Sequence, residues 1–305
     1  MCGLFGFTIY NKDIKNYDKL LNALGDNASV RGTHATGISY NLKHIPVVYK
    51  KPLPAYKMTL KHHTGVKAVT GHTRHATQGK ANQNYNNHPF SGTAGKLAFT
   101  LAHNGIIYND TSLRKQNNIK KTKIDTDSYI YCQLIENAGK LNFDTLASCT
   151  EQLQGYYTFT VLDANDNLYF VRGDSPLSIV HLTRLQMYIY ASTDEILYKA
   201  ILEAGLFDEI LQGHFDIITT EDGQIVKIDS NGKITRATYT PAQTYYNFKN
   251  WYEYGNIDDD ADIDYIDDLL SIARYMGYDD KEIQQLLDDG YTTDDIEELI
   301  YGGGW

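Results

Sequence analysis

The chain has 305 residues, of which 42% are hydrophobic and 22% are charged; these proportions fit a globular protein of one or two domains. It contains no apolar run that approaches the ~20 residues of a membrane span, and its N-terminus lacks the basic and then apolar profile of a secretory signal. Three scattered cysteines without a Cys-x-x-Cys pair exclude a disulfide framework. We therefore expect a protein of the reducing cytoplasm with no membrane partner.

The net charge of −10 is unevenly distributed along the chain. Residues 253–305 contain 17 Asp and Glu but only Arg274 and Lys281 as bases, which leaves residues 1–252 with a net positive charge. A change of this size predicts a domain boundary near Trp251. The basic residues of the first part are dispersed and not interleaved with aromatic residues, so we expect no nucleic-acid partner.

The first half of the chain favours strands around one clear helix. Residues 4–10 are apolar and aromatic, as in a buried strand, and apolar residues recur at helical spacing over about 16–28. Further strands are predicted at 38–40, 68–74 and 97–102. The last of these is expected to stop at Asn104-Gly105, because Asn-Gly is a tight-turn pair.

The second half favours short strands and two more helices. Asp125 or Thr126 can cap a helix over about 127–138, and Ser192 with Glu195 has the spacing of a capping box that opens a helix over about 193–204. Strands are predicted at 156–162, 168–171, 178–181, 187–191, 215–220, 225–228 and 234–239. Many strands and about four helices predict an α+β fold with antiparallel sheets.

The C-terminal part differs from this body. Residues 241–262 have the composition of a linker, aromatic at first and acidic later. After it, apolar residues recur at helical spacing in three short segments, which predicts a small acidic three-helix module. We therefore expect three parts, namely a body at 2–240, a linker at 241–262 and an acidic helical module at 263–301.

Cys2 directly follows the initiator methionine, and small second residues permit removal of that methionine. The mature chain would then begin with a thiol and a free α-amine on one residue. Their ordinary pKa values, about 8.5 and roughly 7.7–8.0, are close enough for the amine to take the proton of the thiol near neutrality. Such a residue is a nucleophile with its own base. The simpler alternative is a small residue that leads into a buried strand.

Further motifs follow Cys2-Gly3-Leu4-Phe5-Gly6 in a recognisable order. They are Arg31-Gly32, Gly71-His72-Thr73-Arg74-His75-Ala76-Thr77-Gln78-Gly79, His88-Pro89, His103-Asn104-Gly105, Thr126-Asp127-Ser128, Arg172-Gly173-Asp174-Ser175-Pro176-Leu177 and Ala191-Ser192-Thr193-Asp194-Glu195. As a set, over roughly residues 2–240, they resemble the class II, or N-terminal-nucleophile, glutamine amidotransferase family. The resemblance implies a four-layer α-β-β-α sandwich of two antiparallel sheets.

The resemblance also implies a catalytic set. Cys2 would attack the side-chain amide of glutamine, with its α-amine as base and later as acid. The Asn104 side-chain amide and the Gly105 backbone N–H would stabilise the oxyanion, and Arg31 would support the N-terminal cysteine. Taken alone, Asn104-Gly105 would usually be only a turn.

A second implied set binds the substrate, because free glutamine carries one charge of each sign. Arg74 would hold the α-carboxylate, with Thr77 nearby, and Asp127 would hold the α-ammonium. His75 and Gln78 stand where many family members carry Trp and His, so the specificity of the pocket stays open. Alone, Arg74 would more often be an ion-pairing arginine and Asp127 a carboxylate in the first turn of a helix.

Other site types find little support. His72, His75, His88 and His103 lack Cys or carboxylate partners at ligand spacing, so we expect no metal. No Gly-rich segment ends in Gly-Lys-Ser/Thr before a helix, and we expect no cofactor. Cys132 and Cys149 are expected to be core thiols.

We therefore predict a glutaminase that hydrolyses L-glutamine to glutamate and ammonia through a γ-glutamyl thioester on Cys2. About 65 residues follow position 240, too few for the second catalytic domain that family members usually carry. The ammonia is then expected to pass to an acceptor on a separate protein, docked through residues 253–305 unless those residues are only a solvated appendage. The alternatives are a hydrolase of other γ-glutamyl amides and a binding protein that keeps the fold without turnover.

Overall fold

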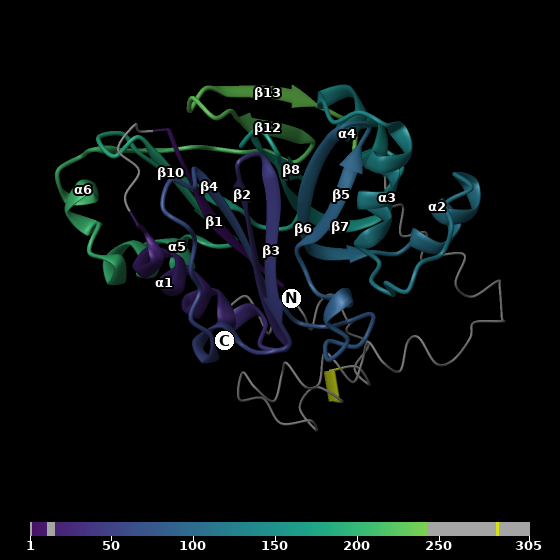
Figure 1. Ribbon diagram of the computed structural model, residues 1–305, viewed down its shortest axis with the longest axis horizontal. Helices are drawn as coiled ribbons and strands as arrows, with labels where there is room; N and C mark the ends of the chain where they lie inside the picture. Colours follow the sequence, from purple (N-terminus) through teal and green to yellow (C-terminus); the bar gives the residue numbers. More distant parts are fainter. Residues whose placement is uncertain (1, 11–15, 243–284, 287–305) are drawn as a thin grey trace. The chain divides into compact units, whose positions relative to one another are not determined.

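A computed structural model describes residues 2–10, 16–242 and 285–286 and contains two β-sheets that face each other (Figure 1). The first sheet has seven strands in the spatial order β11-β9-β10-β1-β4-β2-β3, and the second has six in the order β13-β12-β8-β7-β6-β5. Every described pairing is antiparallel. The predicted antiparallel sheets are therefore confirmed.

The strands of the seven-stranded sheet are β1 (Gly3–Ile9), β2 (Ala35–Leu42), β3 (Ile45–Lys51), β4 (Ala68–Arg74), β9 (Ser178–Leu182), β10 (Met187–Ala191) and β11 (Phe215–Ile217). Those of the six-stranded sheet are β5 (Phe90–Ala94), β6 (Leu97–Ile107), β7 (Gly155–Asp163), β8 (Leu168–Arg172), β12 (Gln224–Ile228) and β13 (Ile234–Thr238).

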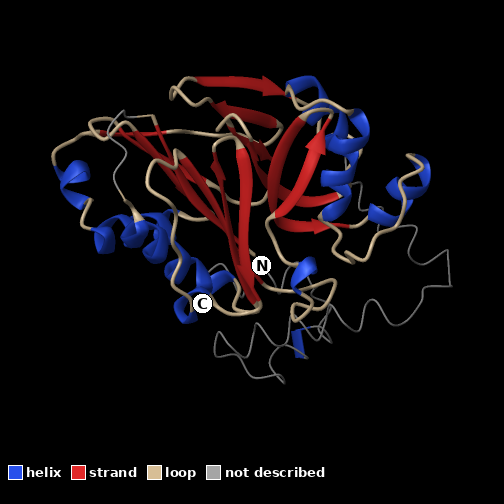
Figure 2. Ribbon diagram, viewed as in Figure 1, coloured by secondary structure: helices blue, strands red, loops and turns tan. Residues whose placement is uncertain are grey.

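Helices lie on the outer faces of both sheets (Figure 2). The described α-helices are α1 (Asp18–Ala28), α2 (Asp110–Gln116), α3 (Tyr129–Ala138), α4 (Phe143–Thr150), α5 (Asp194–Ala204) and α6 (Phe207–Leu211). Helices α1 and α5 cover the seven-stranded sheet, and α3 and α4 cover the six-stranded sheet (Figure 1). The arrangement is the four-layer α-β-β-α sandwich predicted above.

Three apolar clusters hold these layers together. The first joins β1 to α1 and α5, the second joins β6 and β7 to α3 and α4, and the third lies between the two sheets. The alternation along β1 explains how one strand serves two clusters, since Phe5 and Phe7 face the helices whereas Leu4 faces the other sheet. Strand β1 is thus buried on both faces.

The register of β1 brings the start of the chain to the end of β4. Gly3 pairs with Thr73 in the β1–β4 ladder, so Cys2 comes beside Arg74 and His75. The ladder between β2 and β4 pairs Ala35 with Arg74. Three chain segments that are far apart in the sequence therefore meet where β1, β2 and β4 end on one side of the seven-stranded sheet.

Two local predictions are wrong. The strand expected to stop before Asn104-Gly105 continues to Ile107, because β7 pairs with it along its whole length. Neither Asp125 nor Thr126 caps α3, which begins after Ser128 without a side-chain cap, and Asp127 precedes the helix. In both places contacts with a distant segment outweigh the local signal.

Smaller differences concern elements that the sequence pattern did not predict and a helix cap that it predicted one residue too early. Thr193, rather than Ser192, caps α5 by accepting from the Ile196 amide. Strands β3 and β5 and helices α2, α4 and α6 were not predicted. The linker and the three-helix module at 263–301 lie outside the described residues, apart from 241–242 and 285–286. Within the described part of the chain, no helix combines the length and hydropathy needed to cross a membrane.

Candidate active site

Cys2 lies at the edge of the sheet, immediately before β1. Its Sγ is 3.4 Å from the His75 carbonyl oxygen, and its own carbonyl accepts a hydrogen bond from Arg31 Nε at 2.8 Å. Burial raises the pKa of the Cys2 thiol above its ordinary value, and the nearby Arg74 guanidinium opposes that rise. A thiol in this environment carries little thiolate at neutral pH, so it needs a base to become a nucleophile.

Arg74, the last residue of β4, is buried with 2% of its surface exposed. Its guanidinium donates to Asn87 Oδ1 at 2.7 Å, to the Gly79 carbonyl at 2.8 Å and to the Gln78 carbonyl. These partners are neutral oxygens, and no described carboxylate lies within ion-pairing distance of Arg74. A buried cation held only by neutral acceptors retains its attraction for an anion.

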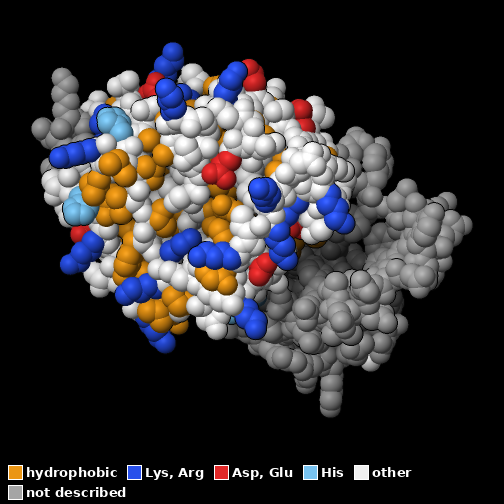
Figure 3. Space-filling view, turned by 45° about the vertical axis from the view of Figure 1, so that its right-hand side comes forward, with side chains coloured by type: hydrophobic (Ala, Val, Ile, Leu, Met, Phe, Trp, Pro, Cys, Tyr) orange, Lys and Arg blue, Asp and Glu red, His pale blue; other side chains and the backbone are white. Residues whose placement is uncertain are grey.

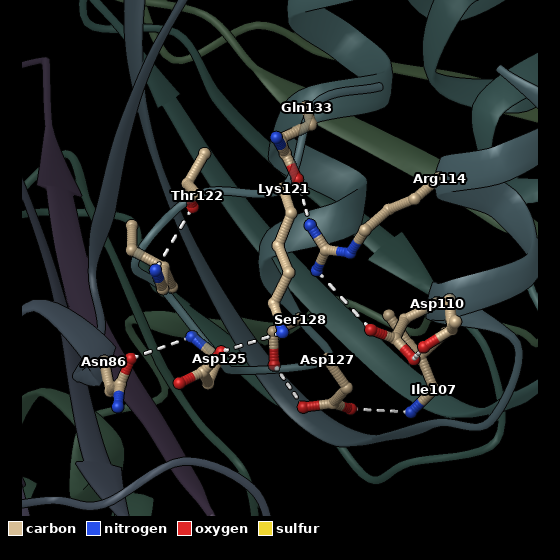
Figure 4. A network of polar contacts seen from close by, with 12 residues as sticks. Asn86, Ile107, Asp110, Arg114, Lys121, Thr122, Asp125, Asp127, Ser128 and Gln133 are labelled. Atoms are coloured by element: carbon tan, nitrogen blue, oxygen red, sulfur yellow. Dashed lines mark hydrogen bonds and ion pairs between the residues drawn. The ribbon is translucent and has the colours of Figure 1, made fainter. Parts of the chain in front are cut away.

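Asp127 supplies a buried charge of the opposite sign. It is 3% exposed, and its carboxylate accepts from the Ile107 amide at 2.7 Å and from the Ser128 hydroxyl at 3.3 Å (Figure 4). Burial raises the pKa of this carboxyl, and the hydrogen bond from Ile107 limits the rise. No described Lys or Arg forms an ion pair with it, so it can receive a cation.

The structure brings Cys2, Arg74 and Asp127 into one electrostatic environment. The charges of Arg74 and Asp127 both act on the pKa of the Cys2 thiol, and those of Cys2 and Asp127 both act on that of Arg74. The N-terminal segment, the end of β4 and Asp127 just before α3 are therefore close enough for their charges to interact. A thiol flanked by a buried cation and a buried anion suits a zwitterionic ligand.

Asn104 lies on β6 with its side chain fully buried, and neither Nδ2 nor Oδ1 has a hydrogen-bond partner. An unsatisfied buried amide costs roughly 1–3 kcal/mol, and such exceptions call for an explanation. The next residue, Gly105, has φ +135°. The free N–H groups of the Asn104 side chain are chemically suited to a developing negative charge.

The loop after β4 holds the remaining candidates. His75 stacks on His34 with ring centroids 4.7 Å apart, and burial lowers the pKa of His75 to about 4. Thr77 and Gln78 are exposed, and only the backbone of Gln78 contacts Arg74. The side chains of Thr77 and Gln78 are thus less enclosed than those of the other candidates.

Gln78 also lines a pocket of about 320 Å³ beside α2. Asp110, Arg114, Ile124 and Asp125 are among its other lining residues, whereas Cys2 is not. Figure 4 shows the polar network around this pocket, with Arg114 directed toward Asp110 and Gln133. The pocket lies next to the segment that carries Asp127, but it does not enclose the Cys2 thiol.

Sequence reasoning missed two residues that hold the candidate side chains. Asn87 accepts from Arg74, and Ser128 joins Asp127 to His103 Nδ1, which lies 2.7 Å from the Ser128 hydroxyl. The run Asn84-Tyr85-Asn86-Asn87 before His88 was the available signal, because several amides in a short loop commonly bond backbone groups. The sequence does not reveal which backbone or side chain each amide reaches.

The sequence also predicts that the protein binds neither a metal ion nor nucleic acid. Within residues 2–10, 16–242 and 285–286, no three His, Cys, Asp or Glu side chains are grouped to hold a metal ion. On the face shown in Figure 3, Lys and Arg side chains are dispersed among hydrophobic and neutral ones. Cys132 and Cys149 are buried in the cluster between the six-stranded sheet and its helices.

Comparison with known proteins shows similarity to glutamine amidotransferases. Residues 72–199 match the family described as the glutamine amidotransferase domain. The chain is 30% identical over 256 residues to the isomerizing glutamine–fructose-6-phosphate aminotransferase of Listeria innocua, and 29% identical over 247 residues to the protein of the same name from Sulfolobus acidocaldarius. These matches cover 79% and 76% of this chain and 39% of each relative. The chain thus spans about two fifths of the length of these curated relatives.

A solved structure shows the same fold. The glutamine phosphoribosylpyrophosphate amidotransferase from B. subtilis matches with a TM-score of 0.61 and 20% identity, over 78% of this chain and 49% of that one.

Proposed function

The chain is similar to class II glutamine amidotransferases, and on this premise we propose that it hydrolyses L-glutamine to glutamate and ammonia with Cys2 as the nucleophile. One observation carries the proposal. A thiol at the second residue of the chain lies beside a buried cation and a buried anion that have no charged partners among the described residues.

The two buried charges fit the two ends of free glutamine. Arg74 would bind the α-carboxylate, since its present partners are neutral oxygens that an anion can outcompete. Asp127 would bind the α-ammonium, since its carboxylate now accepts only from an N–H and a hydroxyl. Thr77, His75 and Gln78 lie on the loop that would border the bound amino acid.

The chemistry then follows in two steps. The α-amine of mature Cys2 takes the proton from Sγ, and the thiolate attacks the amide carbon of the glutamine side chain. The tetrahedral oxyanion accepts from Asn104 Nδ2 and the Gly105 N–H, and the C–N bond breaks as the amine returns the proton to ammonia. Water then hydrolyses the thioester and releases glutamate. Arg31 keeps the Cys2 backbone in place through its carbonyl.

The ammonia released from glutamine needs an acceptor. We expect it to pass to an acceptor on a separate protein, and residues 253–305 offer an acidic segment for docking a basic surface. Removal of 253–305 should abolish capture of that partner in a pull-down while glutaminase activity is retained. Unchanged capture by the shortened chain would remove the docking role.

A second candidate function is favoured by the loop that borders the site. The His34–His75 stack lies beside Cys2, and Gln78 lines a pocket next to the Asp127 segment. Both features suit a substrate larger than glutamine, such as another γ-glutamyl amide. Comparing kcat/KM for glutamine with that for γ-glutamyl conjugates separates the two functions.

Intact-mass analysis before and after treatment with a glutamine-mimicking diazoketone tests the central proposal. We expect a chain that lacks Met1 and gains a single adduct, together with ammonia release from glutamine. The C2A variant should gain none, whereas C149A, which removes a buried thiol, should label like the wild type. Retention of Met1, or a wild type that gains no adduct, would exclude Cys2 as the nucleophile and favour a binding protein. An adduct that persists in C2A would exclude Cys2 as the labelled residue.

A further inference from the structure

Lys50 lies on β3, the edge strand of the seven-stranded sheet, yet its ammonium group is largely buried. Its Nζ donates to the backbone carbonyl of Asn87 and, at 3.0 Å, to that of Pro89. It also lies 5.1 Å from the centroid of the Phe90 ring, within the range of a cation–π contact. The Lys50 ammonium is therefore attached to the segment from Asn87 to Phe90 by three contacts.

The same segment holds Arg74. Asn87 Oδ1 accepts from the Arg74 guanidinium at 2.7 Å, while Asn87 Nδ2 donates to the Ala81 carbonyl at 2.8 Å. Asn84 closes a ring, since its Nδ2 donates to the Lys50 carbonyl at 2.8 Å and its Oδ1 lies 3.2 Å from Asn87 Nδ2. Lys50 thus contacts the loop through both its main chain and its side chain.

This arrangement puts two cations in contact with Asn87, Lys50 through its backbone carbonyl and Arg74 through its side-chain oxygen. Burial first, and the charge of Arg74 second, lower the pKa of Lys50 to about 8. Keeping a second positive charge near Arg74 costs free energy, and none of the described carboxylates forms an ion pair with Lys50. Local costs of this kind are expected at functional sites.

We propose that Lys50 is a positioning residue for glutamine binding, which fixes Asn87 and thereby orients Arg74 toward the substrate carboxylate. The inference rests on the proposed function of Arg74. Lys50 itself would not touch the substrate, so its loss should weaken binding more than it slows the chemical step.

A change in pH can distinguish the effect of the Lys50 charge from the effects of the neighbouring titratable groups. The groups that face it are Arg74 and His72 from β4, His88 from the loop between β4 and β5, and Cys132 from α3. Arginine stays charged throughout, burial lowers the pKa of both imidazoles so that they stay neutral, and burial raises that of the Cys132 thiol. Between pH 7 and 9, Lys50 is therefore the member of this set that changes charge.

Steady-state kinetics of K50M, K50R and K51M test the proposal. K51M is the matched control, since Lys51 is the adjacent, exposed lysine and contacts the Tyr49 ring. We expect K50M to raise KM for glutamine about tenfold, the scale of losing a charge-assisted hydrogen bond, with kcat within about twofold. In the wild type KM should rise as pH passes about 8, and in K50R this rise should be absent. A KM in K50M equal to that of K51M would overturn the proposal.

Amide hydrogen exchange without substrate gives a second readout that does not depend on turnover. Residues 78–88 should exchange faster in K50M than in the wild type or K51M, because the loop loses its anchor. Unchanged exchange there would overturn the positioning role even if KM changed. Failure of the proposed function would look different, because the wild type itself would then neither release ammonia nor take up the diazoketone.

Discussion

At the scale of single residues, the site depends on polar groups that the fold buries without full compensation. The Asn104 amide is fully buried and unpartnered, and the charges of Arg74 and Asp127 are matched by dipoles only. Each is a cost in the free protein that a ligand with the complementary group would offset. The sequence predicts these residues through their motifs, but their burial comes from the two sheets.

Replacing Asn104 by alanine tests the oxyanion role. We expect kcat to fall by about 10²–10³, the usual effect of losing one oxyanion donor, with KM for glutamine within about threefold. Because both polar atoms of Asn104 are unpartnered, urea unfolding should show little loss of stability. A raised KM with an unchanged kcat would assign Asn104 to ground-state binding instead.

Replacing Asp127 by asparagine tests recognition of the α-ammonium. Asparagine keeps the size of the side chain but removes the charge, so KM for glutamine should rise by about 10²-fold, as expected when a buried ion pair loses one partner. The control is D125N, because Asp125 is more exposed and pairs with the exposed Lys121 at 3.9 Å. Equal KM values for the two variants would contradict the assigned role.

At the scale of elements, strand β6 shows how far a local sequence pattern can predict where a strand ends. Asn104-Gly105 is a turn signal, yet the chain stays extended there. The reason is that residues 155–163, which follow α3 and α4 in the sequence, pair with β6. Likewise, Asp127 was expected in the first turn of the helix but lies before α3, where its carboxylate accepts from the Ile107 amide. The apolar central strands and the helices of 3.6-residue period were predictable from sequence. Edge strand β3, which carries Lys50 among mixed residues, was not.

Gly105→Ala tests why glycine occupies this strand. A Cβ at Gly105 would lie 1.9 Å from the Tyr156 carbonyl oxygen, at φ +135°. We expect a stability loss of about 3 kcal/mol and loss of glutaminase activity. Gly139→Ala is the control, because Gly139 also has a positive φ, +68°, but nothing lies within 4 Å of its added Cβ; it should cost about 1 kcal/mol. Equal urea midpoints for the two variants would rule out the close approach as the cause.

At the scale of the whole molecule, imidazoles lie buried where the two sheets meet. His72 of β4 donates from Nε2 to the backbone carbonyl of His103 on β6 at 2.9 Å, and the His88 ring lies 4.2 Å from that of His72. Burial lowers the pKa of His72 and of His103 to about 3. The sandwich is therefore joined through neutral histidines that are ordinarily half-protonated near pH 6.5.

This arrangement predicts that acid destabilises the fold. The unfolded chain binds protons at these histidines below about pH 6.5, whereas the folded chain does not until about pH 3, so the free energy of unfolding falls as the pH drops through that range. At pH 5 each of His72 and His103 should contribute a loss of about 2 kcal/mol relative to pH 7.5. The raised pKa of Asp127 opposes this trend, so the net loss should be below the sum for the two histidines.

Urea unfolding across pH 5–7.5 measures this loss of stability. The free energy of unfolding of H103F should depend less steeply on pH than that of the wild type, whereas a variant of the exposed His63 should behave like the wild type. A stability that stays constant over this range would mean that the imidazoles are protonated within the fold.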